Sequence, residues 1–380
     1  MEVYFDNAAT TAVYPEVKNL MIKLLEEDYG NPSSLHMKGV EAERYIKQAT
    51  TQIAKELKCQ EKELTFTSGG TESNNLAIIG AAMAKRRAGK HIITTNIEHA
   101  SVSATMEFLS KEGYEISTVG VNQDGTVNLE ELKDTLREDT ILVSIMYVNN
   151  EIGTIQPIEE ISKIIKAYNP AILFHVDAVQ AFGKIVFSPK RLGVDLLSIS
   201  GHKIHGPKGS GVLYIKDKTL IRPIIYGGGQ QKAMRSGTEN VPAIAGMGLA
   251  AELMYKDHDH KMAHIKKLKD TFVDKVTALE NVYDNSGEAP HIASISFVGI
   301  RSEVMLHALE DKGIYVSAGS ACSSNKPHVS NVLKAINLDN TKLESTLRFS
   351  FCETNTMEEV DYTIKVIEEI LPVYRRYIRK

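Results

Sequence analysis

Short apolar segments alternate with longer amphipathic segments through the first two thirds of this 380-residue chain, and this alternation restricts the fold most strongly. The apolar segments predict strands at Leu64–Thr67, His91–Thr95, Ile141–Val148, Ile172–Val176, Leu196–Ile199 and Val212–Ile215. Because most of them are continuously apolar, they suit a sheet that is covered on both faces. The amphipathic segments predict helices at Glu72–Ala84, Ala100–Leu109, Leu129–Leu136 and Ile158–Tyr168. The pattern therefore predicts an α/β fold with a mostly parallel sheet.

The pattern changes after about residue 244, where a second unit is expected. Ala243–Lys256 predicts a long helix, the charged stretch Lys256–Lys269 follows, and Ile292–Phe297 and Leu347–Phe351 predict strands. A chain of this length is too long for one compact core. We place the domain boundary near Asp257, with a large domain over residues 16–256 and a small domain over residues 1–15 and 257–380.

Charge and cysteine usage exclude several classes of protein. The chain has 44 Lys and Arg against 48 Asp and Glu, a net charge of −4, so it lacks the basic excess of a nucleic-acid binder. No apolar run reaches the roughly 18 residues that a membrane span needs, and the first residues do not resemble a signal peptide. The three cysteines are far apart and lack metal-ligand spacing, which favours a reducing compartment. We therefore expect a cytoplasmic protein.

Motifs of several other sites are absent or incomplete. No G-x-G-x-x-G follows a strand, and neither G-x-S-x-G nor H-E-x-x-H occurs. Gly201–Lys208 approaches a P-loop, but a proline occupies the place of the P-loop lysine. His258, His260 and His264 cluster in one charged stretch, where a solvated helix face is favoured over a metal site. No metal is expected.

Lys203 has surroundings that a surface lysine does not need. It follows a predicted strand and the small polar residues Ser200 and Gly201, and a Gly/Pro turn comes after it. A lysine that attacks a carbonyl to form a Schiff base must be held rigidly and partly desolvated. Considered alone, an ordinary loop lysine fits this segment equally well.

Polar residues follow two other predicted strands in a similar way. Gly70 and Thr71 lie where a strand turns into a helix, and the free N–H groups of such a turn can bind a phosphate, although a simple helix cap explains them as well. Asp177 ends a buried apolar strand, where a carboxylate needs a cation such as a protonated pyridine nitrogen, unless it only caps a helix. Gln180 comes three residues later, within reach of a ring hydroxyl.

His99 follows a further predicted strand. It can stack on an aromatic ring, or it can be an ordinary loop histidine. Each of these segments is weak by itself. Ligands of open α/β sheets bind at the carboxyl ends of the strands, and a phosphate cup, a stacking ring, a pyridine partner and a lysine are all expected there. Together they predict a pyridoxal phosphate (PLP) site.

Six longer motifs follow one family in order along the chain: Phe5–Thr11, Gly30–His36, Ser68–Asn75, Val148–Thr154, His175–Gln180 and Arg235–Asn240. With them the chain closely resembles the cysteine desulfurases of the NifS/IscS type, which are class V members of the fold-type I PLP enzymes. The resemblance implies a large domain with a mostly parallel seven-stranded sheet and a smaller α+β domain. It also implies a homodimer that takes sulfur from L-cysteine.

The resemblance assigns roles to individual residues. Lys203 would bind the cofactor covalently and move the substrate α-proton, and His99 would stack on the ring. Asp177 would pair with the pyridine nitrogen and Gln180 with the ring oxygen. The remaining cofactor and substrate residues would be Gly70, Thr71, Ser200 and His202 at the phosphate, Thr238 reaching the phosphate from a second subunit, and Asn150 and Arg348 at the substrate carboxylate.

Cys322 lies in a segment of small polar turn formers, residues 317–330, which predicts a mobile loop. Only a thiolate is nucleophilic, and by resemblance the Cys322 thiolate would attack the substrate sulfur, keep it as a persulfide and release alanine. Loop movement would then carry the sulfur outward. Cys59 and Cys352 are expected to have no function.

The sulfur acceptor is not identifiable from the sequence. An iron–sulfur scaffold, a tRNA-thiolation protein or another cofactor pathway all fit, and the segment around Cys322 resembles the longer-loop branch that hands sulfur directly to a partner. Gln231 and Ala233 depart from the acid and glycine that are common in the family. The alternatives are a selenocysteine lyase or other PLP β-lyase on the same fold, a non-catalytic sulfur-relay protein, and an aminotransferase.

Overall fold

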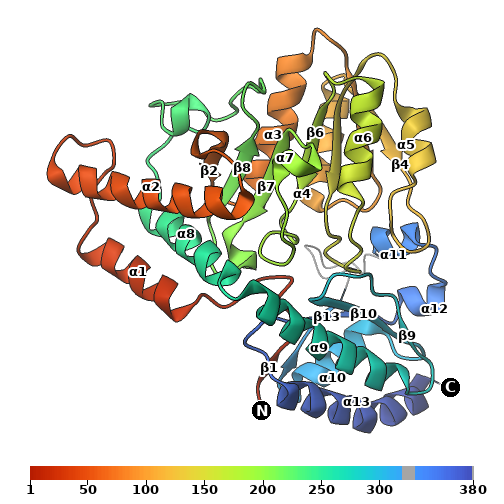
Figure 1. Cartoon of the computed structure of the whole chain (residues 1–380). Helices are drawn as coiled ribbons and strands as arrows, with labels where there is room; N and C mark the ends of the chain where they lie inside the picture. Colours follow the sequence, from red (N-terminus) through yellow and green to blue (C-terminus); the bar gives the residue numbers. More distant parts are fainter. Residues whose placement is uncertain (319–329, 379–380) are drawn as a thin grey trace.

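A seven-stranded sheet forms the centre of the larger part of the molecule, in a computed structural model that describes residues 1–318 and 330–378 (Figure 1). The strand order is β2-β8-β7-β6-β5-β3-β4. β8 is antiparallel to both neighbours, and the other neighbouring strands are parallel, which confirms the expected sheet. The strands are β2 (Leu64–Thr67), β3 (His91–Thr95), β4 (Glu115–Val119), β5 (Thr140–Met146), β6 (Leu173–Asp177), β7 (Leu196–Ser200) and β8 (Gly211–Ile215).

Helices cover both faces of this sheet, which is why its central strands are continuously apolar. Ile92 and Leu142 pack with α3 (Gly70–Lys85) and α4 (Ala100–Lys111). Their neighbours Ile93 and Val143 point to the other face, because successive side chains of a strand alternate, and pack in a core that includes α5, α6 and α8. These three helices are α5 (Leu129–Thr135), α6 (Ile158–Tyr168) and α8 (Val241–Tyr255), and the short α7 (Pro189–Leu192) lies on the same face.

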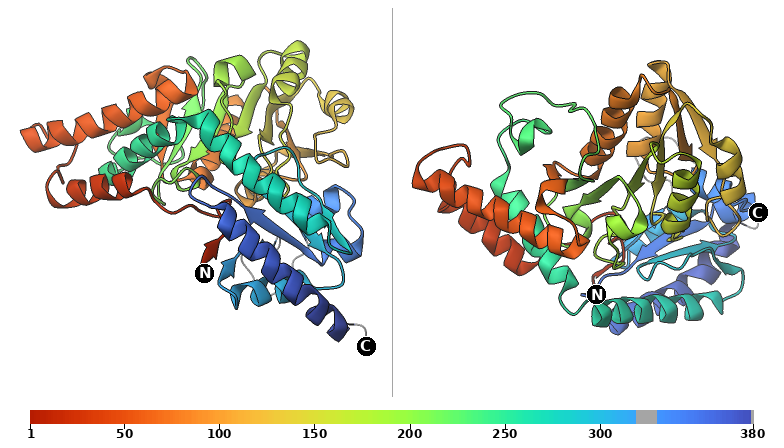
Figure 2. Two further views of the ribbon diagram at one scale, coloured as in Figure 1. Left: turned by 60° about the horizontal axis from the view of Figure 1, so that its bottom comes forward. Right: turned by 45° about the horizontal axis from the view of Figure 1, so that its top comes forward.

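α1 (Pro15–Glu26) and α2 (Met37–Leu57) pack along α8 and project from the sheet as an arm (Figures 1 and 2). α2 and α8 approach closely where Gly248 meets Ala49, since a Cβ on that glycine would lie 2.5 Å from the Ala49 Cα. Neither α1 nor α2 is predicted from the sequence.

The second unit is built on a four-stranded antiparallel sheet with the order β12-β13-β10-β9 and on a parallel pair of β1 and β11. This α+β unit is also as expected. Its strands are β1 (Val3–Tyr4), β9 (Val282–Asp284), β10 (Ile292–Phe297), β11 (Ile314–Tyr315), β12 (Ser317–Ala318) and β13 (Thr346–Ser350). Its helices are α9 (His258–Thr277), α10 (Ser302–Glu310), α11 (Asn331–Ala335), α12 (Asn340–Leu343) and α13 (Met357–Ile378).

Phe272 of α9 anchors the core of this second unit. Its side chain is fully buried, and its ring centroid lies 4.5 Å from that of Phe349 and 5.8 Å from that of Phe351. Replacing Phe272 by alanine is expected to lower the free energy of unfolding by about 3–5 kcal/mol, because it leaves a cavity among these rings. Urea unfolding followed by circular dichroism measures this loss. Phe108→Ala, at a residue that is 47% exposed, is the matched control, and equal losses for both variants would contradict the assignment.

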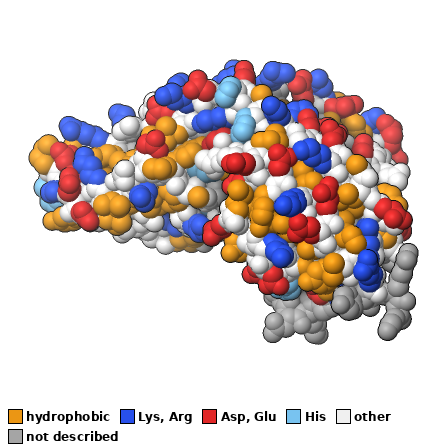
Figure 3. Space-filling model, turned by 90° about the horizontal axis from the view of Figure 1, so that it is seen from below, with side chains coloured by type: hydrophobic (Ala, Val, Ile, Leu, Met, Phe, Trp, Pro, Cys, Tyr) orange, Lys and Arg blue, Asp and Glu red, His pale blue; other side chains and the backbone are white. Residues whose placement is uncertain are grey.

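We propose that the domain boundary lies at Asp257, between α8 and α9. The division of the buried side chains into separate cores supports this: Val17 and Met254 belong to the core of the large sheet, whereas Val3, Phe5 and Ile265 belong to that of the second unit. On the face in Figure 3, acidic and basic side chains are interspersed. Within residues 1–318 and 330–378, no helix is both long and apolar enough to cross a membrane.

Candidate active site

The predicted site residues on four strands meet at one edge of the large sheet. Asp177 ends β6, Ser200 ends β7, and Gly70 and His99 lie where β2 and β3 lead into α3 and α4. β3, β6 and β7 run parallel, and β2 has the same direction because β8 is antiparallel to both β2 and β7. Their carboxyl ends therefore share an edge, where ligands of such sheets bind.

A chain of hydrogen bonds joins Asp177 to His99. The Asn74 side-chain amide donates to Asp177 Oδ2 at 2.7 Å and to Ser101 Oγ at 2.9 Å, and Ser101 Oγ lies 2.9 Å from His99 Nδ1. The backbone N–H of Ser101 also donates to His99 Nδ1, so the neutral ring carries its proton on Nε2. This network fixes the orientation of both functional groups.

Asn74 and Ser101 were not predicted from the sequence. Both are buried, and Asn74 lies one turn before Ala77 on the face of α3 that packs on the sheet. The sequence signal for Asn74 is a polar residue at a position where the helix pattern calls for an apolar one. Such a residue indicates a buried hydrogen-bonded contact, because buried polar groups need partners.

Lys203 lies in η2 (Gly201–Lys203), the tight turn directly after β7. Its ammonium group donates to the carbonyl oxygens of Ala8 at 2.6 Å and of Ala9 at 2.8 Å. The Gln180 amide donates to the same Ala8 oxygen at 2.9 Å. The N-terminal segment thus holds two predicted cofactor residues next to each other.

The start of α3 lies against the end of β7. A Cβ on Gly70 would be 2.8 Å from the Val179 side chain, which follows β6, so a larger residue would clash there, whereas the Ser200 Cβ would be at a contact distance of 3.7 Å. Neither Ser68 nor Thr71 caps α3 with its side chain, which contradicts the simple cap as an explanation of the motif. His202 Nδ1 lies 3.3 Å from the Thr10 hydroxyl. Gly70 and Ser200 are therefore close together, with Thr71 one residue after the first and His202 two residues after the second.

Arg348 of β13 reaches the site from the second unit. Its guanidinium donates to Asp6 Oδ1 at 2.7 Å and to the backbone oxygen of Asn150 at 2.8 Å. Its Nε is buried and has no hydrogen-bond partner in the described part of the chain. The structure thus brings the Arg348 side chain to the backbone of Asn150, and the carboxylate role that the resemblance implies for these residues stays a prediction.

Partial desolvation and neighbouring charges set the protonation of this edge. Desolvation lowers the pKa of His99, the Asp177 carboxylate opposes the shift, and the Lys203 ammonium adds to it. Desolvation and the Lys203 charge also lower the pKa of His202 to about 4. Burial raises the pKa of the Glu98 carboxyl to about 8. Both shifts favour the neutral form of the two imidazole rings, and in His99 the Nδ1 atom is already occupied by the Ser101 N–H.

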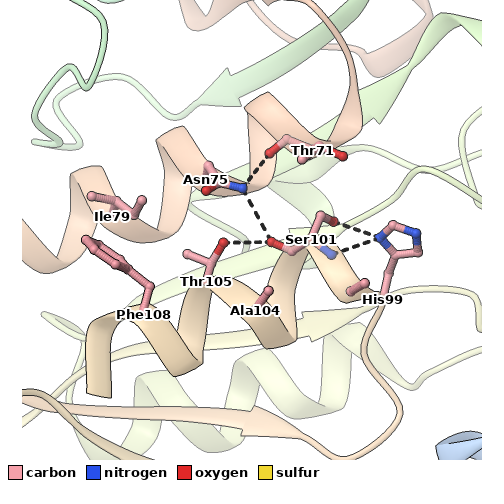
Figure 4. A pocket seen from close by; sticks show the side chains of 9 residues that line it. Thr71, Asn75, Ile79, His99, Ser101, Ala104, Thr105 and Phe108 are labelled. Atoms are coloured by element: carbon pink, nitrogen blue, oxygen red, sulfur yellow. Dashed lines mark hydrogen bonds between the residues drawn. The ribbon is translucent and has the colours of Figure 1, made fainter. Parts of the chain in front are cut away.

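A pocket of about 520 Å³ opens beside His99. Figure 4 shows that His99 and Ser101 of the α4 end face Thr71 and Asn75 of α3, while Ile79 and Phe108 line the far side. The pocket therefore borders the candidate site and continues along the groove between the two helices.

Several predicted residues are not joined to this cluster. Thr238 is exposed in the loop that precedes α8. Cys322 and most of the loop predicted over 317–330 lie outside the described residues. Of the three histidines in α9, His258 stacks on Tyr255 and His264 bonds to the Asn355 carbonyl, so these two serve packing.

Gln231 and Ala233, the two departures from the family pattern, lie in η3 (Gln231–Ala233). Both have a positive φ, 48° and 60°, and Gln231 receives a hydrogen bond from the Phe66 N–H and donates one to Glu239. A glycine at Ala233 would adopt this conformation at less cost. The Gln231 contacts give a local reason for that departure.

Comparison with known proteins identifies the family of this chain. The family model described as aminotransferase class-V matches residues 3–363. The chain belongs to this family. It is 46% identical to a protein named cysteine desulfurase IscS from Dictyoglomus turgidum, over 98% of this chain and 95% of the relative. It is 41% identical to a putative cysteine desulfurase IscS 1 from Bacillus subtilis, over 97% and 98%.

Solved structures agree with this assignment. A NifS-like protein superposes with a TM-score of 0.93 at 42% identity, over 98% of this chain and all of that one. A protein named SspA, solved in complex with cysteine, has a TM-score of 0.82 at 33% identity, over 93% of this chain and all of that one. The resemblance to the cysteine desulfurases and the expected fold are confirmed.

Proposed function

We propose that this class V protein is a PLP-dependent cysteine desulfurase, which converts L-cysteine to L-alanine and keeps the sulfur as a persulfide on Cys322. One observation carries the proposal: Asp177, Asn74, Ser101 and His99 form one hydrogen-bonded chain at the same sheet edge as Lys203, in a protein whose relatives are named cysteine desulfurase.

The residues at this edge fit PLP. The start of α3 offers N–H groups to a phosphate, and Gly70 lets it pack against Val179 with Ser200 beside it. Asp177 is only 6% exposed and accepts hydrogen bonds from the Asn74 amide and the Val179 N–H, and a protonated pyridine nitrogen would balance its negative charge. When bound, PLP supplies a ring that withdraws electrons from the substrate α-carbon.

The residues of the chain would then act on separate parts of the substrate and cofactor. Thr71, Ser200 and His202 would hold the phosphate, while Gln180 would bond to the ring oxygen. Asp177 would keep the ring nitrogen protonated, and His99, fixed by Ser101, would stack on the ring. Lys203 would hold the cofactor and move the α-proton of the substrate.

Arg348 and Asn150 would orient the substrate through its carboxylate. A guanidinium grips a carboxylate with two parallel hydrogen bonds, and the unpartnered Arg348 Nε is one donor for such a pair. The Cys322 thiolate would attack the substrate sulfur, so that a sulfur–sulfur bond forms while the carbon–sulfur bond breaks. The carbon fragment leaves as alanine after protonation.

We also propose a homodimer in which Thr238 completes the phosphate site of the second subunit, and a cytoplasmic location. The exposure of Thr238 in its loop supports the first of these. The persulfide would pass to an acceptor protein, either an iron–sulfur scaffold or a tRNA-thiolation protein.

Intact-protein mass spectrometry after brief incubation with cysteine tests the function. A gain of one sulfur atom on Cys322, with alanine released in parallel, is the expected result. Alanine without protein-bound sulfur would indicate a lyase that releases sulfide or prefers selenocysteine. If protein that holds PLP gave neither alanine nor protein-bound sulfur, that result would contradict the proposal.

Arg348→Lys is expected to raise KM for cysteine by about 10- to 100-fold, because a lysine cannot form the paired hydrogen bonds of a guanidinium. Steady-state alanine formation gives KM and kcat. Arg301→Lys is the matched control, since Arg301 is exposed and pairs with Glu303. If both variants kept the wild-type KM, Arg348 would have no role in carboxylate binding.

A further inference from the structure

A second group of chemically active side chains lies next to the candidate active site. His205 follows the turn that carries Lys203, and Cys352 and Glu353 follow strand β13, which carries Arg348. One donor atom from each residue lies within 4.8 Å of the other two. Among residues 1–318 and 330–378, this is the one cluster of three or more His, Cys, Asp or Glu side chains with such spacing. His205 is 2% exposed and Cys352 is 3% exposed.

The donor atoms have the orientation of metal ligands. His205 Nδ1 lies 2.8 Å from the Ala12 carbonyl oxygen, which requires its proton on Nδ1 and leaves a lone pair on Nε2 when the ring is neutral. Tyr14 donates a hydrogen bond from its hydroxyl to Glu353 Oε1, and its ring stacks on the His205 ring. Metal-binding histidines and carboxylates are held by such outer partners.

Two of the three inward-facing donor atoms lack hydrogen bonds, whereas the third, Cys352 Sγ, lies 3.1 Å from the Thr354 hydroxyl oxygen. His205 Nε2 and Glu353 Oε2 are both buried without a hydrogen bond in the described part of the protein, although they lie 3.2 Å apart. Leaving two buried polar atoms unpaired is costly. A cation between them would satisfy both at once.

We propose that His205, Cys352 and Glu353 bind a zinc ion. Imidazole, thiolate and carboxylate are common zinc ligands, a thiolate disfavours magnesium and calcium, and a carboxylate disfavours copper(I). Tetrahedral zinc, with ligand bonds of about 2.0–2.3 Å, separates its donor atoms by about 3.3–3.7 Å. The histidine–glutamate separation of 3.2 Å already suits this geometry, and Cys352 Sγ has to approach by about 1 Å at most. The fourth position is left for a water molecule, and binding releases the thiol proton.

The positive charge of Lys184 would weaken zinc binding, so removing this charge provides a test of the site. Its ammonium group is buried without a hydrogen bond in the described chain, and its charge acts on both Cys352 and His205. Lys184→Met removes a nearby positive charge and is expected to lower the zinc Kd at least about tenfold.

The position of the ion gives it a structural effect. His205 lies two residues after Lys203, and Cys352 lies four residues after Arg348. Zinc would therefore tie the turn of the cofactor lysine to the strand of the substrate arginine. This proposal does not depend on the proposed desulfurase activity.

Metal analysis of the EDTA-washed full-length protein, produced with zinc in the medium, tests the site. We expect one zinc per chain in the wild type, and X-ray absorption at the zinc edge should show one sulfur ligand among nitrogen and oxygen ligands. Cys352→Ser and Glu353→Gln should each lose most of the zinc. Cys59→Ser and Cys322→Ser, the other two cysteines, should keep it.

Thermal unfolding separates metal binding from a folding defect. Zinc should raise the Tm of the wild type and of Cys59→Ser, but not of Cys352→Ser or Glu353→Gln with native circular dichroism. If the wild type contained no zinc, the site would not exist. If zinc persisted in Cys352→Ser and disappeared in Cys322→Ser, the metal would be bound at Cys322 and the proposal would be wrong.

Discussion

Lys203→Ala is expected to lower the rate of alanine formation from cysteine by at least about 10³-fold, because it removes both the group that would bind the cofactor covalently and the base that would move the α-proton. The turn itself should remain, since the hydrogen bond from the Ile204 N–H to the Gly201 carbonyl is backbone only. The visible absorbance of the bound cofactor should shift, and borohydride should no longer attach it to the protein.

Lys208→Ala is the matched control for this experiment. Lys208 lies five residues later and is exposed, so its loss should change the rate by less than about twofold. Retained absorbance together with cofactor fixation by borohydride in Lys203→Ala would show that another lysine forms the covalent bond.

Cys322→Ser is expected to abolish the persulfide and to reduce alanine formation to the background rate, while the cofactor absorbance is unchanged. A serine hydroxyl is a much weaker nucleophile toward sulfur than a thiolate, and the proposed cofactor residues lie elsewhere in the chain. Mass spectrometry and an alanine assay on the same samples measure both losses.

Cys59→Ser should behave like the wild type in these assays. Burial raises the pKa of the Cys59 thiol to about 12, so this cysteine stays protonated and unreactive at neutral pH. Normal alanine production with a persulfide on Cys59 or Cys352 in the Cys322→Ser protein would move the nucleophile to another site.

The strands of the large sheet were predictable because both of their faces are buried. β2 and β3 have the expected bounds, and β5 to β8 differ from them by one or two residues. β4 was missed because it is an edge strand whose residues are mostly half-buried or exposed, so it lacks a continuous apolar run. A strand that is buried on both faces has a continuous apolar sequence, which is easier to recognise than the mixed sequence of a partly exposed edge strand.

The arm of α1 and α2 was missed for a different reason. Both helices pack on α8, which is roughly 200 residues away in the sequence, and in α2 this contact is formed by Ala49 against Gly248. Both helices are nevertheless amphipathic, with Val17 and Leu24 buried in α1 and Ile53 and Leu57 in α2, so only their distant packing partner is absent from the local sequence.

The main residues of the candidate site could be predicted from the sequence, but the contacts that hold them in place could not. Residues at strand ends indicated Lys203, Asp177 and His99, because the sheet topology brings such ends together. The hydrogen-bonded link through Asn74 and Ser101 depends on how α3 and α4 pack, and the Ala8 carbonyl depends on the path of the N-terminal segment. These are tertiary contacts that no local motif contains.

The pairing of Asp6 with Arg348 also has a consequence for biosynthesis. The two residues are 342 positions apart, so the N-terminal segment leaves the ribosome long before its partner is made. At about 5–20 residues per second, that interval is roughly 20–70 s. The proposed cofactor residues between Gly70 and Lys203 are complete only after the middle of this period, and Arg348 is made at its end. Until Arg348 has been made, the chain lacks the guanidinium that would bind the substrate carboxylate, so the proposed substrate site is completed only at the end of this interval.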